Sequence, residues 1–294
     1  MTVSSARRTS GLVISSLDER NTSWRLGIDF KPIARTLIYA NVSKGYKSGS
    51  FPNLNGTTDA SYRAVTQESV LAYEAGFKTD LGVRIVQLNG AVFLYDYKDK
   101  QLRARVVDPL GVFGAVEALV NVPKSRVRGA ELSATVQPLP GLDLNGAVTY
   151  VDTEVTSDFQ NFNPFGAPAN FRGEAFPFTP KWMLQGSIDY EWSLTSRLDA
   201  FAGVNASHRS STTSAFGRNA PASPYPYSLL LVDAYTLVDG QIGIADPAGR
   251  WRVTAFGRNL LNRYYYTDAF RQIDNVARHV GEPRTYGVRI NYNF

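Results

Sequence analysis

Two stretches of the chain gather aromatic side chains, and one of them adds arginines and a histidine. The segment 157–178 contains Phe159, Phe162, Phe165, Phe171, Phe176 and Phe178. The segment 262–281 contains Tyr264, Tyr265, Tyr266 and Phe270 beside Arg271, Arg278 and His279. Aromatic faces stack on planar rings or sugars, and arginines pair with anions, so these segments are suited to ligand binding. Alternatively, the aromatics pack the two segments against each other or lie at a membrane interface.

These segments lie between regular elements, where a rigid scaffold commonly carries its binding residues. We therefore predict a ligand-binding set, drawn from both segments, that consists of Phe162, Phe165, Phe171, Tyr264, Tyr265, Arg271, Arg278 and His279.

Other kinds of site have little support in the sequence. The chain has no Cys, and its two histidines, His208 and His279, are too few for a histidine-based metal centre. No nucleophile motif surrounds either histidine. The formal charge of +5 is spread along the chain without a Lys/Arg-rich block, which argues against nucleic-acid binding. We expect no enzyme activity, no resident metal, no cofactor and no nucleic-acid partner.

The aromatic segments lie between regular stretches of sequence. In those stretches apolar and polar residues alternate with a period of two, as they do in β-strands with one apolar face. The last strand is an example, because Val288, Ile290, Tyr292 and Phe294 alternate with polar residues. No segment has convincing helical periodicity. About eleven strands are predicted, near 24–30, 36–46, 71–78, 84–103, 123–136, 142–150, 182–192, 198–206, 229–244, 250–261 and 288–294.

The connections between these strands alternate between short and long. Short turns are predicted near 31–35, 79–82, 138–141 and 246–249, and longer connections at 47–66, 104–120, 157–178, 210–228 and 262–281. This alternation is typical of a meander with short turns on one side and long loops on the other.

A soluble β-sandwich and a membrane barrel would both show this alternation, and strand length helps to separate them. Several predicted strands reach about ten residues, whereas strands of soluble proteins average about five or six. Trp182 and Trp192 end one apolar row, at the level where amphipathic rings meet lipid headgroups. No run of about 18 apolar residues exists, so a transmembrane helix is not expected. We predict an all-β fold, an antiparallel transmembrane β-barrel meander.

Several motifs resemble the barrel of TonB-dependent outer-membrane receptors. They are Tyr39-Ala-Asn-Val-Ser-Lys-Gly-Tyr-Lys-Ser-Gly49, Leu71-Ala-Tyr-Glu-Ala-Gly-Phe-Lys-Thr-Asp80, Asn121-Val-Pro-Lys-Ser-Arg-Val-Arg-Gly-Ala-Glu131, Phe178-Thr-Pro-Lys-Trp182, Gly257-Arg-Asn-Leu-Leu-Asn-Arg-Tyr264 and Gly281-Glu-Pro-Arg-Thr-Tyr-Gly287. Each is weak alone, but together they span about residues 24–294 in order.

The resemblance implies a barrel of about 22 strands with a plug in its lumen, in the outer membrane of a Gram-negative bacterium. It implies partners as well: outer-membrane lipid, the barrel-assembly machinery, and TonB through a plug that this chain lacks. By the same resemblance, Gly287, Ile290, Tyr292 and Phe294 form the barrel-assembly signal. Residues 23–294 are then expected to be the carboxy-terminal half of a truncated receptor barrel, and residues 1–22 a loop remnant or partial strand.

The function implied by this resemblance is energised uptake of a scarce ligand. A ferric siderophore is the first expectation, because loop aromatics can stack on catecholate rings and arginines can pair with an anionic ferric chelate. Uptake of glycans or cobalamin, a passive porin and a soluble β-rich binding protein remain alternatives.

Overall fold

An eleven-stranded antiparallel sheet dominates the protein, as the sequence predicts. The computed structural model describes residues 6–8, 11–13, 16–51, 64–82, 85–107, 115–220, 223, 225–272 and 275–294. Parts of the segment 1–22 and of four predicted connections, 47–66, 104–120, 210–228 and 262–281, therefore lie outside the described residues, as does the first residue of the predicted strand 84–103. Within the described ranges, no helix is long and apolar enough to cross a membrane.

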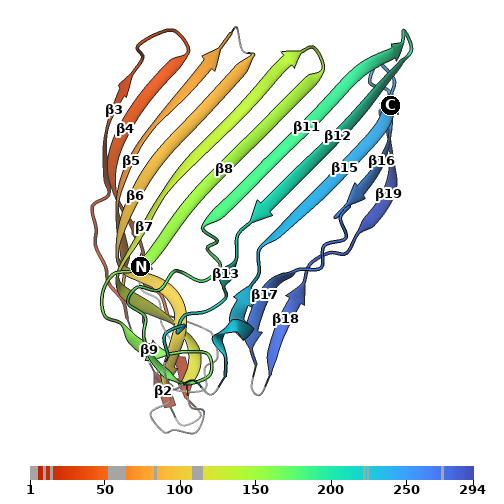
Figure 1. The fold of residues 1–294 in the computed structure, drawn as a ribbon. Helices are drawn as coiled ribbons and strands as arrows, with labels where there is room; N and C mark the ends of the chain where they lie inside the picture. Colours follow the sequence, from red (N-terminus) through yellow and green to blue (C-terminus); the bar gives the residue numbers. More distant parts are fainter. Residues whose placement is uncertain are drawn as a thin grey trace.

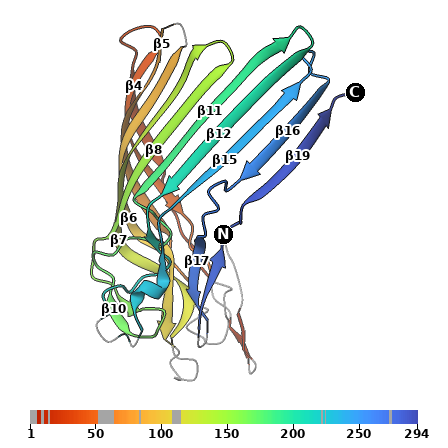
Figure 2. The same cartoon turned by 45° about the vertical axis from the view of Figure 1, so that its right-hand side comes forward.

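The strands of the main sheet follow one another in chain order, each antiparallel to its neighbours, and together they curl into an open trough (Figures 1 and 2). In spatial order they are β3 (Trp24–Phe30), β4 (Thr36–Lys47), β5 (Glu68–Leu81), β6 (Val86–Val107), β7 (Ala115–Leu139), β8 (Leu142–Val155), β11 (Trp182–Thr195), β12 (Leu198–Arg209), β15 (Tyr235–Ala245), β16 (Trp251–Arg258) and β19 (Thr285–Tyr292). Strands β3 and β19 form its two edges.

Small elements occupy the remaining segments, mostly as two-stranded pairs within the long loops. They are β1 (Ala6–Arg8) with β2 (Gly11–Val13), β9 (Gln160–Phe162) with β10 (Pro168–Asn170), β13 (Thr212–Thr213) with β14 (Leu231–Val232), β17 (Tyr266–Arg271) with β18 (Val276–Val280), and the 3-10 helix η2 (Tyr227–Leu230).

One face of the main sheet is apolar across its whole width. The register aligns the apolar rows of successive strands, so that Leu144 lies opposite Ile188 and Ile188 lies opposite Val204. These side chains are exposed; Ile28 on one edge strand and Val288 on the other are both 69% accessible. An apolar surface of this extent on an antiparallel sheet is what a lipid environment requires.

The opposite face is polar and its side chains converge. Arg252 on β16 reaches Glu191 on β11, with a 3.3 Å distance between Nη1 and Oε2, although β12 and β15 lie between these strands. A contact between side chains three strands apart is possible only where the sheet curves toward them, so the polar face is the concave one. The guanidinium of Arg252 also lies 3.4 Å from the ring centre of Phe201.

The two ends of the trough differ in their connections (Figure 1). The tight connections β3–β4, β5–β6, β7–β8, β11–β12 and β15–β16 lie at one end, together with the carboxyl terminus. The long loops, with the small strand pairs β9–β10 and β17–β18, lie at the other. This is the predicted alternation of short and long connections.

The structure corrects the predictions for four segments. The predicted connection 104–120 is largely strand, because β6 continues to Val107 and β7 begins at Ala115. The predicted strand 229–244 begins only at Tyr235, because η2 and β14 occupy its first residues. The predicted loops 157–178 and 262–281 each contain a short hairpin, which their irregular aromatic spacing does not reveal.

Candidate functional site

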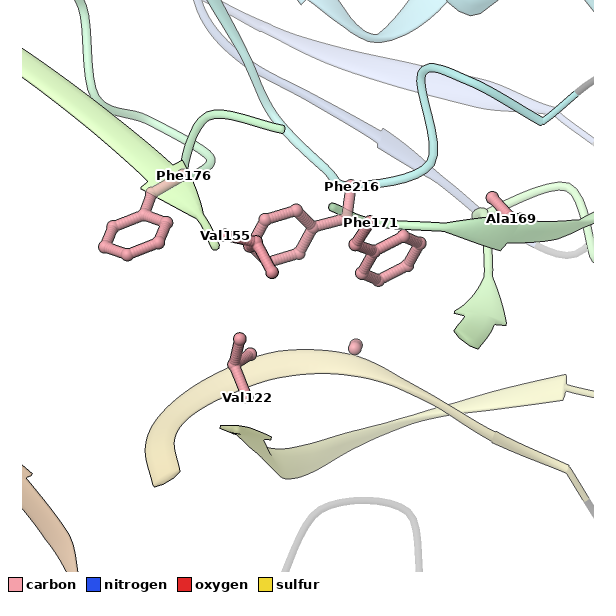
Figure 3. Packing of buried hydrophobic residues seen from close by; sticks show 7 residues of the cluster. Val122, Val155, Ala169, Phe171, Phe176 and Phe216 are labelled. Carbon is pink, nitrogen blue, oxygen red and sulfur yellow. The ribbon is translucent and has the colours of Figure 1, made fainter. Parts of the chain in front are cut away.

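The long hairpin β6–β7 extends to the loop end of the trough. We call its far part, residues 99–107 of β6 and 115–123 of β7, the distal hairpin. Lys98 pairs with Lys124 and Lys100 pairs with Val122, so Asp99 lies opposite Pro123. Asp99 has a positive φ of 54°, and a proline cannot donate a ladder hydrogen bond, so the hairpin is irregular at this point. Figure 3 shows β7 curving at Val122, whose side chain points toward the loops.

A buried carboxylate fixes the strand just beyond this irregularity. Glu68 at the start of β5 accepts a hydrogen bond from the backbone N–H of Gln101 at 2.8 Å and pairs with Nζ of Lys100 at 3.3 Å. The side-chain amide of Gln101 donates to the carbonyl oxygens of Ser48 and Thr66. The distal hairpin is thereby attached to the ends of β4 and β5.

An aromatic core joins this hairpin to two long loops (Figure 3). The ring of Phe171 stacks on that of Phe216 with centroids 4.9 Å apart, and Phe176 meets Phe216 edge-on at 6.5 Å. Val122 of β7 and Val155 at the end of β8 are fully buried in the same cluster. Burying these side chains gives the loops a fixed arrangement, because each contributes about 1.5–3 kcal/mol.

Buried polar groups hold the same loops together. Glu174 accepts hydrogen bonds from the backbone N–H groups of Gly217 at 2.6 Å and Asn219 at 3.2 Å, which ties the loop 156–181 to the loop 210–234. Within the first loop, Oδ1 of Asn163 accepts from the N–H groups of Phe165 and Ala167, both at 2.9 Å. These loops therefore form a structured platform.

A cavity of about 510 Å³ lies between this platform and the hairpin β17–β18; we call it the loop cavity. Its walls combine aromatic, aliphatic and charged side chains from β6, β7, β17, β18 and the two loops. The described residues that line it are Leu102, Arg103, Ala104, Arg105, Glu117, Phe162, Pro164, Phe171, Pro177, Phe178, Ser214, Ala215, Phe216, Leu230, Asp268, Ala269, Phe270, Arg271 and His279.

The charges in the loop cavity are close to one another. Burial lowers the pKa of Arg105, and nearby Arg271 lowers it further, whereas Glu117 acts in the opposite direction. Glu117 also lies 3.7 Å from Nη1 of Arg103. Arg271 donates a hydrogen bond to the carbonyl oxygen of Pro164 at 2.9 Å. Because arginine keeps its charge in proteins, the cavity presents fixed positive groups beside aromatic rings.

The structure gathers four of the eight predicted ligand-binding residues in the wall of this cavity: Phe162, Phe171, Arg271 and His279. Phe171, however, is only 1% accessible and serves mainly as core, which was the packing alternative for such aromatics. Phe165 does not line the cavity, but its ring centre lies 5.5 Å from the guanidinium of Arg271, which does.

The other three predicted residues do not line it. Arg278 donates to the carbonyl oxygen of Leu229 at 3.2 Å, next to the cavity residue Leu230. Tyr264 is exposed and meets Tyr266 edge-on. Tyr265 packs on Tyr235, with ring centres 4.4 Å apart, and lines a separate hollow on the polar face of the sheet.

Sequence reasoning missed the charged residues from β6 and β7. Arg103, Arg105 and Glu117 alternate along the distal hairpin, and 104–120 had been predicted as a connection. Asp268 was missed because no pattern marks it in the sequence. Leu102, Ala104 and Val106 alternate with Arg103 and Arg105, and this continuation of the strand pattern could have identified Arg105.

Comparisons with known proteins agree with this architecture. The sequence model of the family described as TonB dependent receptor-like, beta-barrel matches residues 2–260. The metal-pseudopaline receptor CntO of Pseudomonas aeruginosa is 28% identical over 283 residues, which are 95% of this chain and 34% of that receptor. The chain thus spans about a third of the length of this curated relative.

Two solved receptors share the fold. The ferric yersiniabactin uptake receptor FyuA from Yersinia pestis superposes with a TM-score of 0.72 at 20% identity, covering 92% of this chain and 37% of that one. The siderophore receptor PiuA from Acinetobacter baumannii gives a TM-score of 0.70 at 18% identity, covering 97% and 37%. With the family model matching most of its length, the chain belongs to the family of TonB-dependent receptor β-barrels, proteins of the Gram-negative outer membrane.

Proposed function

We propose that this chain is the carboxy-terminal part of an outer-membrane receptor that takes up a metal chelate, such as a ferric siderophore, by TonB-dependent active transport. The observation that carries the proposal is the loop cavity, which holds arginines and aromatic rings at the loop end of a lipid-facing sheet. Arginines pair with anionic chelates, and aromatic rings stack on the flat groups that many chelators contain.

The related proteins support a metal chelate as the ligand. The relative that matches along nearly the whole chain is named for a metal–pseudopaline complex, and the two structural relatives are named for ferric yersiniabactin and a siderophore. Glycan and cobalamin uptake find no counterpart among these names. TonB would act through a plug outside the present chain.

Uptake of radioactive iron chelates tests this function. The natural-length gene is expressed in a host that lacks its own ferric-siderophore receptors, and accumulation of ⁵⁵Fe-labelled catecholate and hydroxamate complexes is measured. We expect uptake that a protonophore abolishes. Arg271→Gln should weaken binding about tenfold, since a charge-assisted hydrogen bond contributes about 1.5–3 kcal/mol. Arg271→Lys, which keeps the positive charge, should retain part of the binding affinity.

A matched control uses another arginine at the loop end. Arg172 pairs with Asp158 at 3.6 Å and lies outside the loop cavity, so Arg172→Gln should bind as the wild type does. Uptake that persists with the protonophore present would identify a passive porin. Binding of maltooligosaccharides or cobalamin in place of every iron chelate would overturn the metal-chelate proposal.

We also infer that the terminal strand carries the signal for barrel assembly. Ile290 and Tyr292 are exposed on the apolar face, and the ring of Phe294 meets Tyr292 edge-on at 5.1 Å. Gly287 shares the strand but faces the polar side, where Phe256 covers it. Phe294→Ala should reduce the folded receptor in outer membranes, whereas Ile28→Ala on the other edge strand should not. Equal yields from both variants would contradict the inference.

A further inference from the structure

A histidine and a carboxylate form a pair in the wall of the loop cavity. Asp268 on β17 and His279 on β18 are directly opposite in the strand register, and the register shifts between Tyr266 and Asp268. Such a β-bulge turns side chains to a new direction. Here Oδ2 of Asp268 lies 3.4 Å from Nδ1 of His279.

The pair combines the two groups that metal-binding histidines commonly use. A histidine that binds a metal through one ring nitrogen usually donates its other ring N–H to a carboxylate, which fixes the ring and increases its basicity. With Nδ1 facing Asp268, the lone pair of Nε2 remains for a metal. The side chain of His279 is 65% exposed and packs beside Phe270 with ring centres 5.2 Å apart, so an incoming ligand can reach it.

A second feature of the pair points to a cation. Oδ1 of Asp268 is buried and, among the described residues, has no hydrogen-bond partner. An unpaired carboxylate oxygen is costly to bury, and a nearby positive charge lowers that cost. The carboxylate is therefore suited to a site that receives a metal together with its chelator.

The rest of the cavity cannot hold a bare metal ion. No group of three or more metal-ligating side chains occurs among the described residues, so the other ligands must come with the metal. Apart from His279, the described charged residues of the cavity wall are three arginines, Arg103, Arg105 and Arg271, against Glu117 and Asp268, an excess of one positive charge. This balance suits a weakly anionic chelate better than a multiply charged tris-catecholate.

We propose that Nε2 of His279 binds the metal of an incoming chelate directly, by replacing a metal-bound water, and that Asp268 is its positioning residue. The preferred cargo is a chelate with an open coordination position, such as a transition metal held by an aminocarboxylate. This rests on the proposed function, because it names the kind of chelate that the loop cavity selects.

Copper chelates provide a direct test. The natural-length receptor is purified in detergent without a histidine tag and mixed with Cu²⁺–nitrilotriacetate, which leaves coordination open, or with Cu²⁺–EDTA, which does not. Pulsed electron paramagnetic resonance detects an imidazole nitrogen bound to copper. We expect that signal only with nitrilotriacetate, and tighter binding of that complex by about tenfold or more.

Variants assign the signal to the pair. His279→Gln should abolish the imidazole signal and the preference for the open chelate. Asp268→Asn should weaken binding about tenfold, the usual cost of losing such a carboxylate, and Asp268→Glu should restore part of it. The control is His208→Gln, because His208 lies on the main sheet, where its Nδ1 is 2.9 Å from Oγ1 of Thr236. This variant should keep the signal.

The outcomes separate this inference from the function on which it rests. Equal binding of both copper chelates with no imidazole signal would overturn direct coordination, while the Arg271-dependent uptake of iron chelates would stand. Binding of ferric catecholates alone would likewise overturn direct coordination and leave the proposed function standing. If neither copper nor iron chelates bind, both the inference and the proposed function fail. An imidazole signal that survives His279→Gln would also overturn the inference.

Discussion

Tyr227 shows how a single buried group stabilises the loop end. Its hydroxyl donates to the carbonyl oxygen of Ala215 at 2.5 Å and contacts the hydroxyl of Thr213. Burial raises the pKa of Tyr227 from 10.0 to about 12, and the negative charge of Glu174 acts in the same direction. The folded state therefore favours the neutral phenol, which keeps the two ends of the loop 210–234 together.

This raised pKa predicts a pH dependence. Because the folded pKa lies above the unfolded one, the stabilising contribution of Tyr227 is complete below pH 10 and is lost as the pH rises through about 12. In an alkaline absorbance titration of the purified receptor, Tyr227→Phe should remove one late-ionising tyrosine. The neighbouring exposed Tyr225 serves as control, and Tyr225→Phe should leave that late step intact. A late step unchanged in Tyr227→Phe would contradict the prediction.

At the scale of residues, the sequence offered candidate residues but not the way in which the loops arrange them. Phe162, Arg271 and His279 were predicted from the residue types in two long connections, and they line the loop cavity. Tyr265 has the same composition signal but packs on Tyr235. Which aromatic becomes core and which meets a ligand depends on loop packing between distant segments, and a single sequence does not contain that information.

At the scale of elements, the period-two pattern located all eleven strands because each has one lipid-facing and one polar face. The prediction of a connection at 104–120 was wrong, because the alternation is short and weak where the hairpin β6–β7 packs against loops instead of lipid. Where one face of a strand no longer meets a uniform apolar environment, the alternation of apolar and polar residues is a weaker strand signal.

Glycines opposite aromatic rings offer a test of packing within the sheet. A Cβ on Gly129 would lie 2.3 Å from the carbonyl oxygen of Tyr150 and 2.5 Å from Cζ of Phe93, whereas one on Gly146 would meet nothing within 4 Å. Gly129→Ala should therefore cost about 1–3 kcal/mol of unfolding free energy, as overpacking does. Gly146→Ala should be neutral or slightly stabilising.

Urea titration of the heat-modifiable band in gels measures both glycine variants under the same conditions. The Gly129→Ala midpoint should fall, and the Gly146→Ala midpoint should match or exceed that of the wild type. Equal losses in both variants would show that backbone conformation, not the ring of Phe93, determines the effect.

At the scale of the whole molecule, the apolar face predicts how substitutions depend on orientation. Ile188 lies near the middle of β11 on the apolar face, between Leu144 and Val204, and its neighbour Ser187 points to the polar face. Ile188→Arg should cost about 2–4 kcal/mol, because it places a charge in lipid. Ser187→Arg should cost much less. Urea unfolding of the receptor in lipid vesicles compares the two, and equal costs would contradict a lipid-facing assignment.

The two edge strands have a geometric consequence of their own. In a sheet of eleven antiparallel strands, β3 and β19 run in the same direction, from the loop end to the turn end. A second copy inserted in the same orientation would meet either edge only as a parallel strand, so two copies cannot complete each other by antiparallel pairing. Any segment that closes the sheet must add an odd number of strands. A second copy also adds an odd number of strands, so the direction of the edge strands, and not their number, disfavours self-association.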